Sequence, residues 1–298
     1  MVVAGAAHVG WVRRQTPEIP RDNVILEGIG RNTAASVALA ARWARARYGD
    51  AVMVVLPADH WIAPGAAFRS TLRRGIGAVQ RLGGLLTIGV PALAADSGFG
   101  YVRPGGRELL PGVRASREFV EKPPPARARW MVASGRFLWN SGVFVWRATT
   151  ILKELRRHRP DLARPIEAWA RRRRGTWRVP AAALRKVPAV PIDRAVLERS
   201  RDVLLLRGRF RWTDLGTWAA FRDLLRKDRR GNAGLGGLMA IGSSGCLGVN
   251  QDGLSVFVGL DDVVAVRSGE VVLVCRRGAA QRLRDVVARL RGRYRDLR

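Results

Sequence analysis

The sequence predicts an α/β fold followed by a small β-rich region, and three observations support this. The chain has 298 residues, 47% of them hydrophobic, which is enough to bury the core of one large domain and a smaller second one. The first third alternates short apolar runs with longer segments of helical character. The last quarter alternates short strands with turns.

The first third reads as strand, helix, strand, helix, strand. We expect strands over 23–28, 51–59 and 84–90, and helices over 32–49 and 68–82. Asn32 or Thr33 is the expected N-cap of the first helix, and Gly49 lies near its end. Ligands of open α/β sheets bind beyond the carboxyl ends of the strands, so we expect Asp59 and His60 at a binding crevice.

Beyond residue 90 the pattern is looser. We expect a Gly-rich loop over 98–105, a short strand over 117–123, a turn and strand over 139–148, helices over 149–173, and strand, loop and helix over 202–225. The polar, Gly-containing stretch 226–234 is typical of a linker. We therefore predict a large domain over 1–228 and a small β region over 229–298 that ends in a basic helix near 279–296.

The formal net charge of +29 first suggests a nucleic-acid partner. However, only Lys122, Lys153, Lys186 and Lys227 are lysines, and arginine occurs almost everywhere, which is typical of coding bias. The densest run, RRRRG at 171–175, has no base-stacking pattern and no helix-turn-helix or zinc-finger spacing. Nucleic-acid binding is thus the weaker alternative, and the positive field favours small anionic substrates.

No apolar run approaches the roughly 18 to 20 residues that span a bilayer. The first residues also lack a basic segment followed by an apolar one, which a secretory signal would require. The sequence therefore predicts a cytoplasmic protein without a membrane partner.

Six short stretches occur in the order typical of one enzyme family. They are GRNTAAS (30–36), VVLPADH (54–60), GFGYV (98–102), FVEKP (119–123), FLWNSGVF (137–144) and WTDLGTW (212–218). In these motifs the chain resembles the mannose-1-phosphate guanylyltransferase family, and its tail (259–274) resembles the family's short β region. The resemblance implies a Rossmann-like nucleotidyltransferase (GT-A-like) domain, a mixed sheet flanked by helices, and a reaction that joins GTP to mannose 1-phosphate.

Nucleotidyl transfer brings anions together, and a Mg²⁺ ion held by one or two carboxylates can neutralise them. Asp59, after a strand, and Asp214, in a loop flanked by tryptophans, resemble the family's catalytic, metal-binding aspartates. The alternative is structural, because Asp59 could cap a turn and Asp214 could cap the helix near Thr217. His60 could orient a bond to the metal aspartate or serve the fold alone.

Two further stretches point to the sugar phosphate. Glu121 offers an acceptor for sugar hydroxyls beside Lys122, a point charge suited to phosphate, and the resemblance assigns this pair to sugar-phosphate binding and Lys122 to catalysis as well. Asn140 and Ser141 can bond sugar hydroxyls. Taken alone, a Glu-Lys pair is more often an exposed ion pair that contributes little to stability, and Asn-Ser-Gly is an ordinary turn sequence.

Two glycine-containing segments are weaker candidates. Gly100 permits close approach of the backbone to a ligand, and Tyr101 could stack on or bond to the sugar, although a lone G-x-G is more often a turn. Arg31, Asn32 and Thr33 stand at a helix start and could face the nucleotide, as the resemblance implies, although capping explains Asn32 and Thr33 almost as well.

The family opens with a G-x-G-T-R-x-W-P loop that cradles the triphosphate, and this sequence contains no such stretch. Its opening resembles the region after that loop, so we expect impaired turnover, strand edges without partners and marginal stability. Two alternatives remain, namely an inactive protein that binds a sugar phosphate or nucleotide sugar, and a basic nucleic-acid-binding protein. The β tail could also serve contact between subunits of a homo-oligomer.

Overall fold

The computed structural model describes the chain except residues 171–176, 283–285, 287–288, 291–293 and 295–298. It consists of two compact units. The first comprises Met1–Ala58 and Ile62–Trp212, and the second comprises Asp59–Trp61 and Thr213–Arg298. The boundary near residue 228 expected from the sequence lies beyond helix α8 (Trp218–Leu224), whereas the compact units already divide at residue 213.

The first unit is built on a six-stranded sheet in the order β3-β8-β5-β10-β7-β6. Strands β5 and β10 run parallel, whereas β3, β5 and β6 all run antiparallel to β8, so the sheet is mixed as predicted. The strands are β3 (Val52–Val55), β5 (Leu85–Pro91), β6 (Gly100–Leu110), β7 (Val113–Glu121), β8 (Leu138–Arg147) and β10 (Val203–Arg207).

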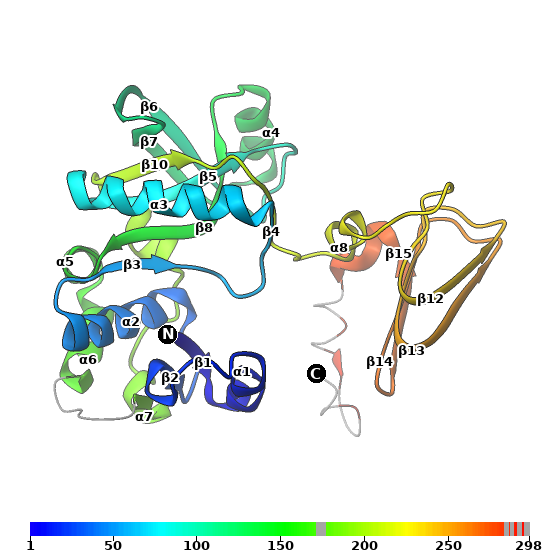
Figure 1. Ribbon diagram of the computed structural model, residues 1–298, viewed down its shortest axis with the longest axis horizontal. Helices are drawn as coiled ribbons and strands as arrows, with labels where there is room; N and C mark the ends of the chain where they lie inside the picture. The colour runs from blue at the N-terminus through cyan, green and yellow to red at the C-terminus, as the bar shows by residue number, and fades with distance from the viewer. Residues whose placement is uncertain (171–176, 283–285, 287–288, 291–293, 295–298) are drawn as a thin grey trace. The chain divides into compact units, whose positions relative to one another are not determined.

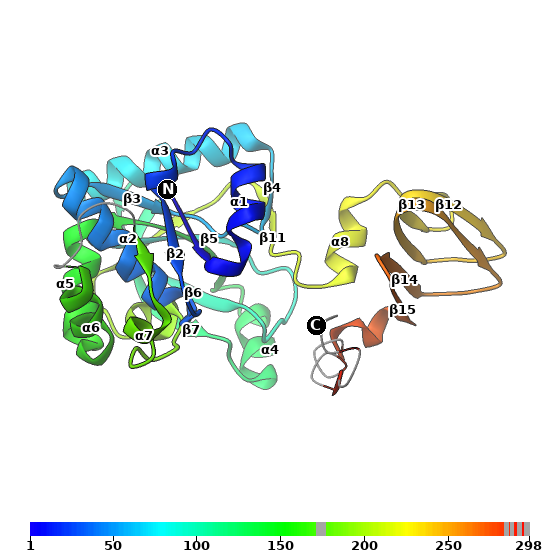
Figure 2. The same ribbon diagram turned by 90° about the horizontal axis from the view of Figure 1, so that it is seen from below.

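Helices cover both faces of this sheet (Figure 1). One face carries α2 (Asn32–Tyr48), α5 (Ala148–His158) and α6 (Pro160–Ala170), which Figure 2 shows gathered on one side of the unit, and the other carries α3 (Gly65–Leu82). Each face has its own apolar core. Trp146 of β8 lies in the core beneath α2 and α5, while the preceding Val145 lies in the core beneath α3, as the alternation of side chains along a strand requires.

A smaller parallel sheet in the order β1-β2-β9 completes the first unit. Its strands are β1 (Val2–Gly5), β2 (Val24–Glu27) and β9 (Arg178–Val179), and the remaining helices of the unit are α1 (Val9–Gln15), α4 (Pro125–Ala133) and α7 (Ala181–Leu184). Among the described residues, β1 pairs only with β2, and β3 pairs only with β8.

The prediction of a Gly-rich loop over 98–105 is wrong from residue 100 onward, because Gly100–Leu110 forms the long strand β6. Strand β6 pairs antiparallel with β7 from Gly100↔Glu121 to Leu110↔Val113. Cross-strand hydrogen bonds of this hairpin outweigh the low strand propensity of its glycines. The other strands and helices expected over 23–90 are confirmed to within a few residues, except that α3 begins at Gly65 and β3 ends at Val55.

The second unit contains α8 and a four-stranded sheet, β12 (Ala233–Ile241), β13 (Leu247–Val258), β14 (Val263–Ser268) and β15 (Val271–Arg276). Strands β12, β13 and β14 run parallel through short connections, so each successive segment stacks on the last. Their apolar core packs against Trp218 and Phe221 of α8. This arrangement is a small β coil, as the sequence predicted in outline.

A short two-stranded sheet joins β4 (Trp61–Ala63) and β11 (Arg211–Thr213). The RRRRG run at 171–175 and most of the helix expected near 279–296 lie outside the described residues; the part from Arg277 to Arg282 is a 3₁₀ turn. Within the described part of the chain, no helix combines the length and apolarity needed to cross a bilayer.

Candidate functional site

Charged and amide side chains from four segments meet on the six-stranded sheet of the first unit. We call Thr87, Glu121, Lys122, Asn140 and Asp193 the polar cluster. Thr87 lies on β5, Asn140 on β8, Glu121 at the end of β7, and Asp193 at the start of a short π-helical turn, Asp193–Leu197. Such π turns recur at functional sites. Three members, Glu121, Lys122 and Asn140, are residues that the sequence nominated.

Hydrogen bonds fix the amide of Asn140 at the centre of the cluster. The hydroxyl of Thr87 donates to Asn140 Oδ1 over 2.8 Å, and Asn140 Nδ2 donates to Asp193 Oδ1 over 2.8 Å. Asn140 is 7% exposed and Thr87 is fully buried. A buried amide with both ends bonded has one favourable orientation, so it holds the Asp193 carboxylate in place.

Gly100 leaves room for the Glu121 carboxylate against the backbone of β6. A Cβ atom at residue 100 would lie 2.5 Å from Glu121 Oε2 and 3.3 Å from the Cβ of Asn140. Gly100 pairs directly with Glu121 in the β6–β7 ladder. The glycine that the sequence suggested for close approach to a ligand therefore permits, in this structure, close approach of the site's own carboxylate.

The chain turns sharply at Lys122. Its backbone is left-handed, with φ of 51°, which is uncommon for a residue with a side chain and clusters at functional sites. The Lys122 N–H donates to Phe99 O over 3.2 Å, and Glu198 Oε1 accepts from the Glu121 N–H over 2.7 Å. Lys122 Nζ lies 3.6 Å from Glu121 Oε1, and the lysine side chain is 54% exposed, so its ammonium is available to a ligand.

Burial disfavours the ionised forms of both carboxyl groups in the cluster. Burial, and next the negative charge of Asp193, raise the pKa of Glu121 to about 7, although the Lys122 ammonium opposes this. Burial raises the pKa of Asp193 to about 6, against hydrogen bonds from its own backbone and from Asn140. Each carboxyl group can accept hydrogen bonds from hydroxyl groups when it is ionised, whereas the Lys122 ammonium is the group that can attract an anion.

Two nominated residues lie inside the protein. Tyr101 is fully buried, and its hydroxyl donates to Asp96 O over 2.9 Å and accepts from Asp96 N. Ser141 is also fully buried and donates to Ile88 O over 2.7 Å. In this structure both side chains support the strands and loop around the polar cluster, and their contact with a sugar stays a prediction.

The segment nominated for the nucleotide is tied to the stretch that leads into Asp193. Arg31 Nε donates to Leu184 O over 2.9 Å, and Ile192 N donates to Thr33 Oγ1 over 2.9 Å. Asn32 has a φ of 61°, and its Oδ1 accepts from Thr33 N, so neither Asn32 nor Thr33 caps α2 as expected. A nucleotide-binding role for this segment stays a prediction.

The nominated metal ligands belong to the second compact unit. Asp59 precedes β4 by two residues and Asp214 follows β11 directly, and β4 and β11 pair with each other. The Asp59 side chain is 84% exposed, with His60 Nε2 4.0 Å from Oδ1. Asp214 Oδ1 accepts from Gly216 N over 3.0 Å. No group of three or more His, Cys, Asp or Glu residues suited to a metal occurs among the described residues.

Sequence reasoning missed Thr87, Asp193 and Glu198. A signal existed for the acids, because the chain has only 24 Asp and Glu against 53 Lys and Arg, and Asp193 directly follows an apolar, Pro-containing run. Asp193 and Glu198 flank the same short turn and reach neighbouring groups, Asn140 and the Glu121 N–H. No local pattern identifies Thr87, because its role depends on β5 pairing with β8.

A mixed sheet between helices with an appended parallel β region is an architecture of nucleotidyltransferase-like α/β proteins. The chain belongs to the nucleotidyl transferase family, whose model matches residues 7–231. Residues 236–290 match the model of the MannoseP isomerase/GMP-like beta-helix domain, which agrees with the parallel coil of β12 to β14.

Named relatives agree with the resemblance seen in the motifs. The chain is 33% identical over 296 residues to the xanthan biosynthesis protein XanB of Xanthomonas campestris pv. campestris and covers 62% of its length. It is 33% identical to the mannose-1-phosphate guanylyltransferase ManC of Salmonella typhimurium, again with 98% of this chain and 62% of that protein aligned. The chain thus spans about three fifths of the length of these relatives.

Solved structures confirm the fold. A protein described as mannose-1-phosphate geranyltransferase from Thermus thermophilus superimposes with a TM-score of 0.82 at 24% identity, over 97% of this chain and 98% of that one. The Rossmann-like fold with a small C-terminal β region, predicted from the sequence, is therefore confirmed.

Proposed function

We propose that this protein is a nucleotidyltransferase that forms GDP-mannose and pyrophosphate from GTP and mannose 1-phosphate. The observation that supports this most directly is the polar cluster, in which two largely buried carboxyl groups, a fixed amide and an exposed ammonium stand together. Guanine and mannose come from the motifs and from the names of similar proteins such as ManC of Salmonella typhimurium.

The polar cluster would bind the sugar phosphate. Glu121 and Asp193 would accept hydrogen bonds from sugar hydroxyls, because each retains oxygen lone pairs beyond the bonds within the cluster. Lys122 would neutralise the phosphate through its exposed ammonium. In the first unit, the rings of Phe99 and Trp139 pack 4.9 Å apart beside Gly100 and Asn140, which would give the sugar an apolar wall.

Asp59 and Asp214 would hold the divalent cation that this family requires, and we propose Mg²⁺. The residues fit such an ion, because Mg²⁺ is usually bound by one or two carboxylates together with substrate phosphates rather than by a cage of protein ligands. Asp59 is exposed, and Asp214 has an oxygen beyond the one bonded to Gly216. When bound, the ion would neutralise the reacting phosphates.

Pyrophosphate release from GTP and mannose 1-phosphate tests the proposal with a matched pair of lysine variants. Lys122→Ala is expected to lower kcat/KM by about 100-fold, because it removes the cluster's only ammonium. Lys153→Ala removes the same charge from an exposed position on α5 and should leave the rate unchanged. Equal rates for both variants would refute the role of the cluster.

Thermal denaturation separates transfer from binding alone. If mannose 1-phosphate raises the Tm of the wild-type protein but no pyrophosphate forms with GTP and Mg²⁺, the chain binds the sugar phosphate without turning it over. If neither GTP nor mannose 1-phosphate shifts the Tm, the assignment of the substrates is wrong.

A further inference from the structure

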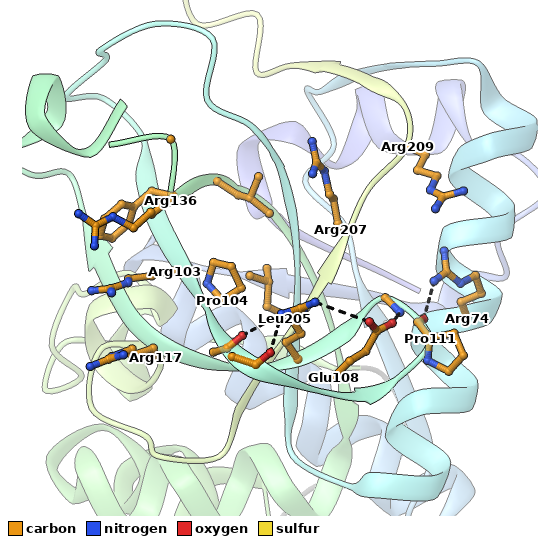
Figure 3. Close-up of a pocket in the computed structure, with 17 residues that line it drawn as sticks. Arg74, Arg103, Pro104, Glu108, Pro111, Arg117, Arg136, Leu205, Arg207 and Arg209 are labelled. Carbon is orange, nitrogen blue, oxygen red and sulfur yellow. Dashed lines mark hydrogen bonds and ion pairs between the residues drawn. The ribbon is translucent and has the colours of Figure 1, made fainter. Parts of the chain in front are cut away.

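A cavity of about 760 Å³ in the first unit is walled by arginines and contains none of the polar cluster (Figure 3). We call it the arginine cavity. Figure 3 shows Arg103, Arg117 and Arg136 on one side of the cavity and Arg74 and Arg209 on the other, with Arg207 between them. These residues come from α3, the β6–β7 hairpin, the turn before β8 and the end of β10.

The cavity has almost no negative charge of its own. Its only acidic lining residue is Glu108, which accepts a hydrogen bond from Gly112 N and pairs with a further lining arginine, Arg114, over 3.6 Å. Arg114 is also held by Gly106 O over 2.7 Å, and Arg74 donates to Pro111 O over 2.6 Å. The one acid is therefore already matched by one of the seven arginines.

The remaining guanidinium groups lack a compensating partner. Arg117, Arg136, Arg207 and Arg209 make no side-chain hydrogen bond or ion pair with the described residues, and all four are exposed. The Arg103 guanidinium lies over the ring of Phe137, 6.0 Å from its centroid, and makes no hydrogen bond or ion pair with the described residues. Like charges around a concavity repel one another, and an anion at the centre would relieve this repulsion.

The shape of the cavity limits what this anion can be. Its volume suits a small molecule. Guanidinium groups on facing walls suit a ligand with more than one phosphate, because each group presents a planar fork to phosphate oxygens. A nucleic-acid duplex would need a larger surface, and a single strand would need exposed aromatic rings, whereas Phe137, the one aromatic residue lining the cavity, is 4% exposed.

We propose that the arginine cavity is a second anion site that binds a compact polyphosphate such as pyrophosphate or the phosphate tail of a nucleotide. The inference goes beyond the proposed transfer reaction and does not depend on it. Its residues differ from those of the polar cluster, although β7 and β8 contribute to both. Substitutions can therefore separate the two sites.

Calorimetric titration of the full chain with inorganic pyrophosphate, at physiological salt and without divalent cations, tests the proposal. All proteins carry Lys122→Ala, which weakens binding at the polar cluster. Adding Arg207→Ala and Arg209→Ala is expected to weaken binding at least about tenfold. The control adds Arg73→Ala and Arg81→Ala, which remove the same charge from exposed positions on α3 outside the cavity and should change the affinity less than about twofold.

Further measurements make the outcome decisive. If the alanine pair fails to fold by circular dichroism, Arg207→Lys and Arg209→Lys keep the charge, and weaker pyrophosphate binding by this pair supports the proposal. Equal affinities in the cavity and control variants would overturn it, as would orthophosphate binding as tightly as pyrophosphate. If the variant with Arg207→Ala and Arg209→Ala loses binding to a short DNA duplex but still binds pyrophosphate, the arginines form a nucleic-acid surface and the proposal is overturned.

Discussion

Asn140 Nδ2 lies 2.8 Å from Asp193 Oδ1, and this hydrogen bond joins β8 to the π-helical turn 53 residues further along the chain. Because Thr87 donates to the other end of the same amide, Asn140 cannot rotate without losing both bonds. We therefore regard Asn140 as a positioning residue that sets the Asp193 carboxylate beside Glu121. These hydrogen bonds predict how substitutions in the polar cluster change stability and binding.

Asn140→Asp replaces the amide donor with a second acid next to Asp193. Ionisation of both would place like charges at hydrogen-bond distance, so the variant should be less stable than the wild type by roughly 1 to 3 kcal/mol at pH 8. At pH 5 one proton can bridge the two oxygens, and the difference should shrink. Urea denaturation at both pH values measures the effect, and an equal loss at pH 5 and pH 8 would contradict it.

Because of Glu121, the stability of the folded protein is expected to fall as the pH rises. Its pKa is raised to about 7, so the folded protein favours the protonated carboxyl; the stabilisation is complete below about pH 4 and is lost as the pH rises through 7. Glu121→Gln retains a neutral side chain. At pH 8 it should be more stable than the wild type by roughly 2 kcal/mol, and near pH 4 the two should be equal.

Glu118→Gln provides the control for this prediction. Glu118 lies on the same strand, but its side chain is 31% exposed and pairs with Arg127 over 2.7 Å. Removing this charge should lower stability at pH 8 by less than about 1 kcal/mol. A gain of stability from both substitutions would show that loss of any carboxylate on this strand, rather than burial of Glu121, is responsible.

The sequence predicted the strands and helices expected over 23–90 to within a few residues, because apolar periodicity is a local property. It also nominated Glu121, Lys122 and Asn140, which the structure brings together. It did not identify Thr87, whose role depends on β5 pairing with β8, and the local signal at Asp193 did not show that this residue reaches Asn140. The β6–β7 hairpin shows the same limit. The glycines of β6 suggest a loop, and β6 is a strand because it pairs with β7.

Gly100→Ala tests whether the close approach of Glu121 to β6 matters. A Cβ atom would lie 2.5 Å from Glu121 Oε2, so the carboxylate must move. We expect a loss of roughly 1 to 3 kcal/mol in stability and at least tenfold weaker binding of mannose 1-phosphate. Gly106→Ala, on the same strand, would meet no atom within 4 Å and should change stability by less than about 0.5 kcal/mol. Similar effects from both would argue against the contact.

Asp59→Asn and Asp214→Asn test the proposed cation site. Each keeps the size of the side chain and removes a charge, so each should raise the Mg²⁺ concentration for half-maximal pyrophosphate release by at least about tenfold, with little change in Tm. Asp252→Asn removes an exposed carboxylate of the second unit and should leave the Mg²⁺ dependence unchanged. If Asp59→Asn and Asp214→Asn behave like this control, the two aspartates are not ligands of the ion; Asp214 then serves only its bond to Gly216 N, since Thr217 itself caps α8.

Two glycines of α3, two residues apart, should respond in opposite ways to the same substitution. A Cβ atom at Gly77 would meet nothing within 4 Å, so Gly77→Ala removes backbone freedom from the unfolded chain without a clash and should stabilise the protein by about 0.5 to 1 kcal/mol. At Gly75 the atom would lie 3.3 Å from Val145 Cγ2 and 3.4 Å from Leu86 Cδ2, in the core beneath α3. There the crowding should offset or exceed the same gain. The difference between the two urea midpoints measures how closely α3 packs on the sheet, and a larger gain from Gly75→Ala would contradict that packing.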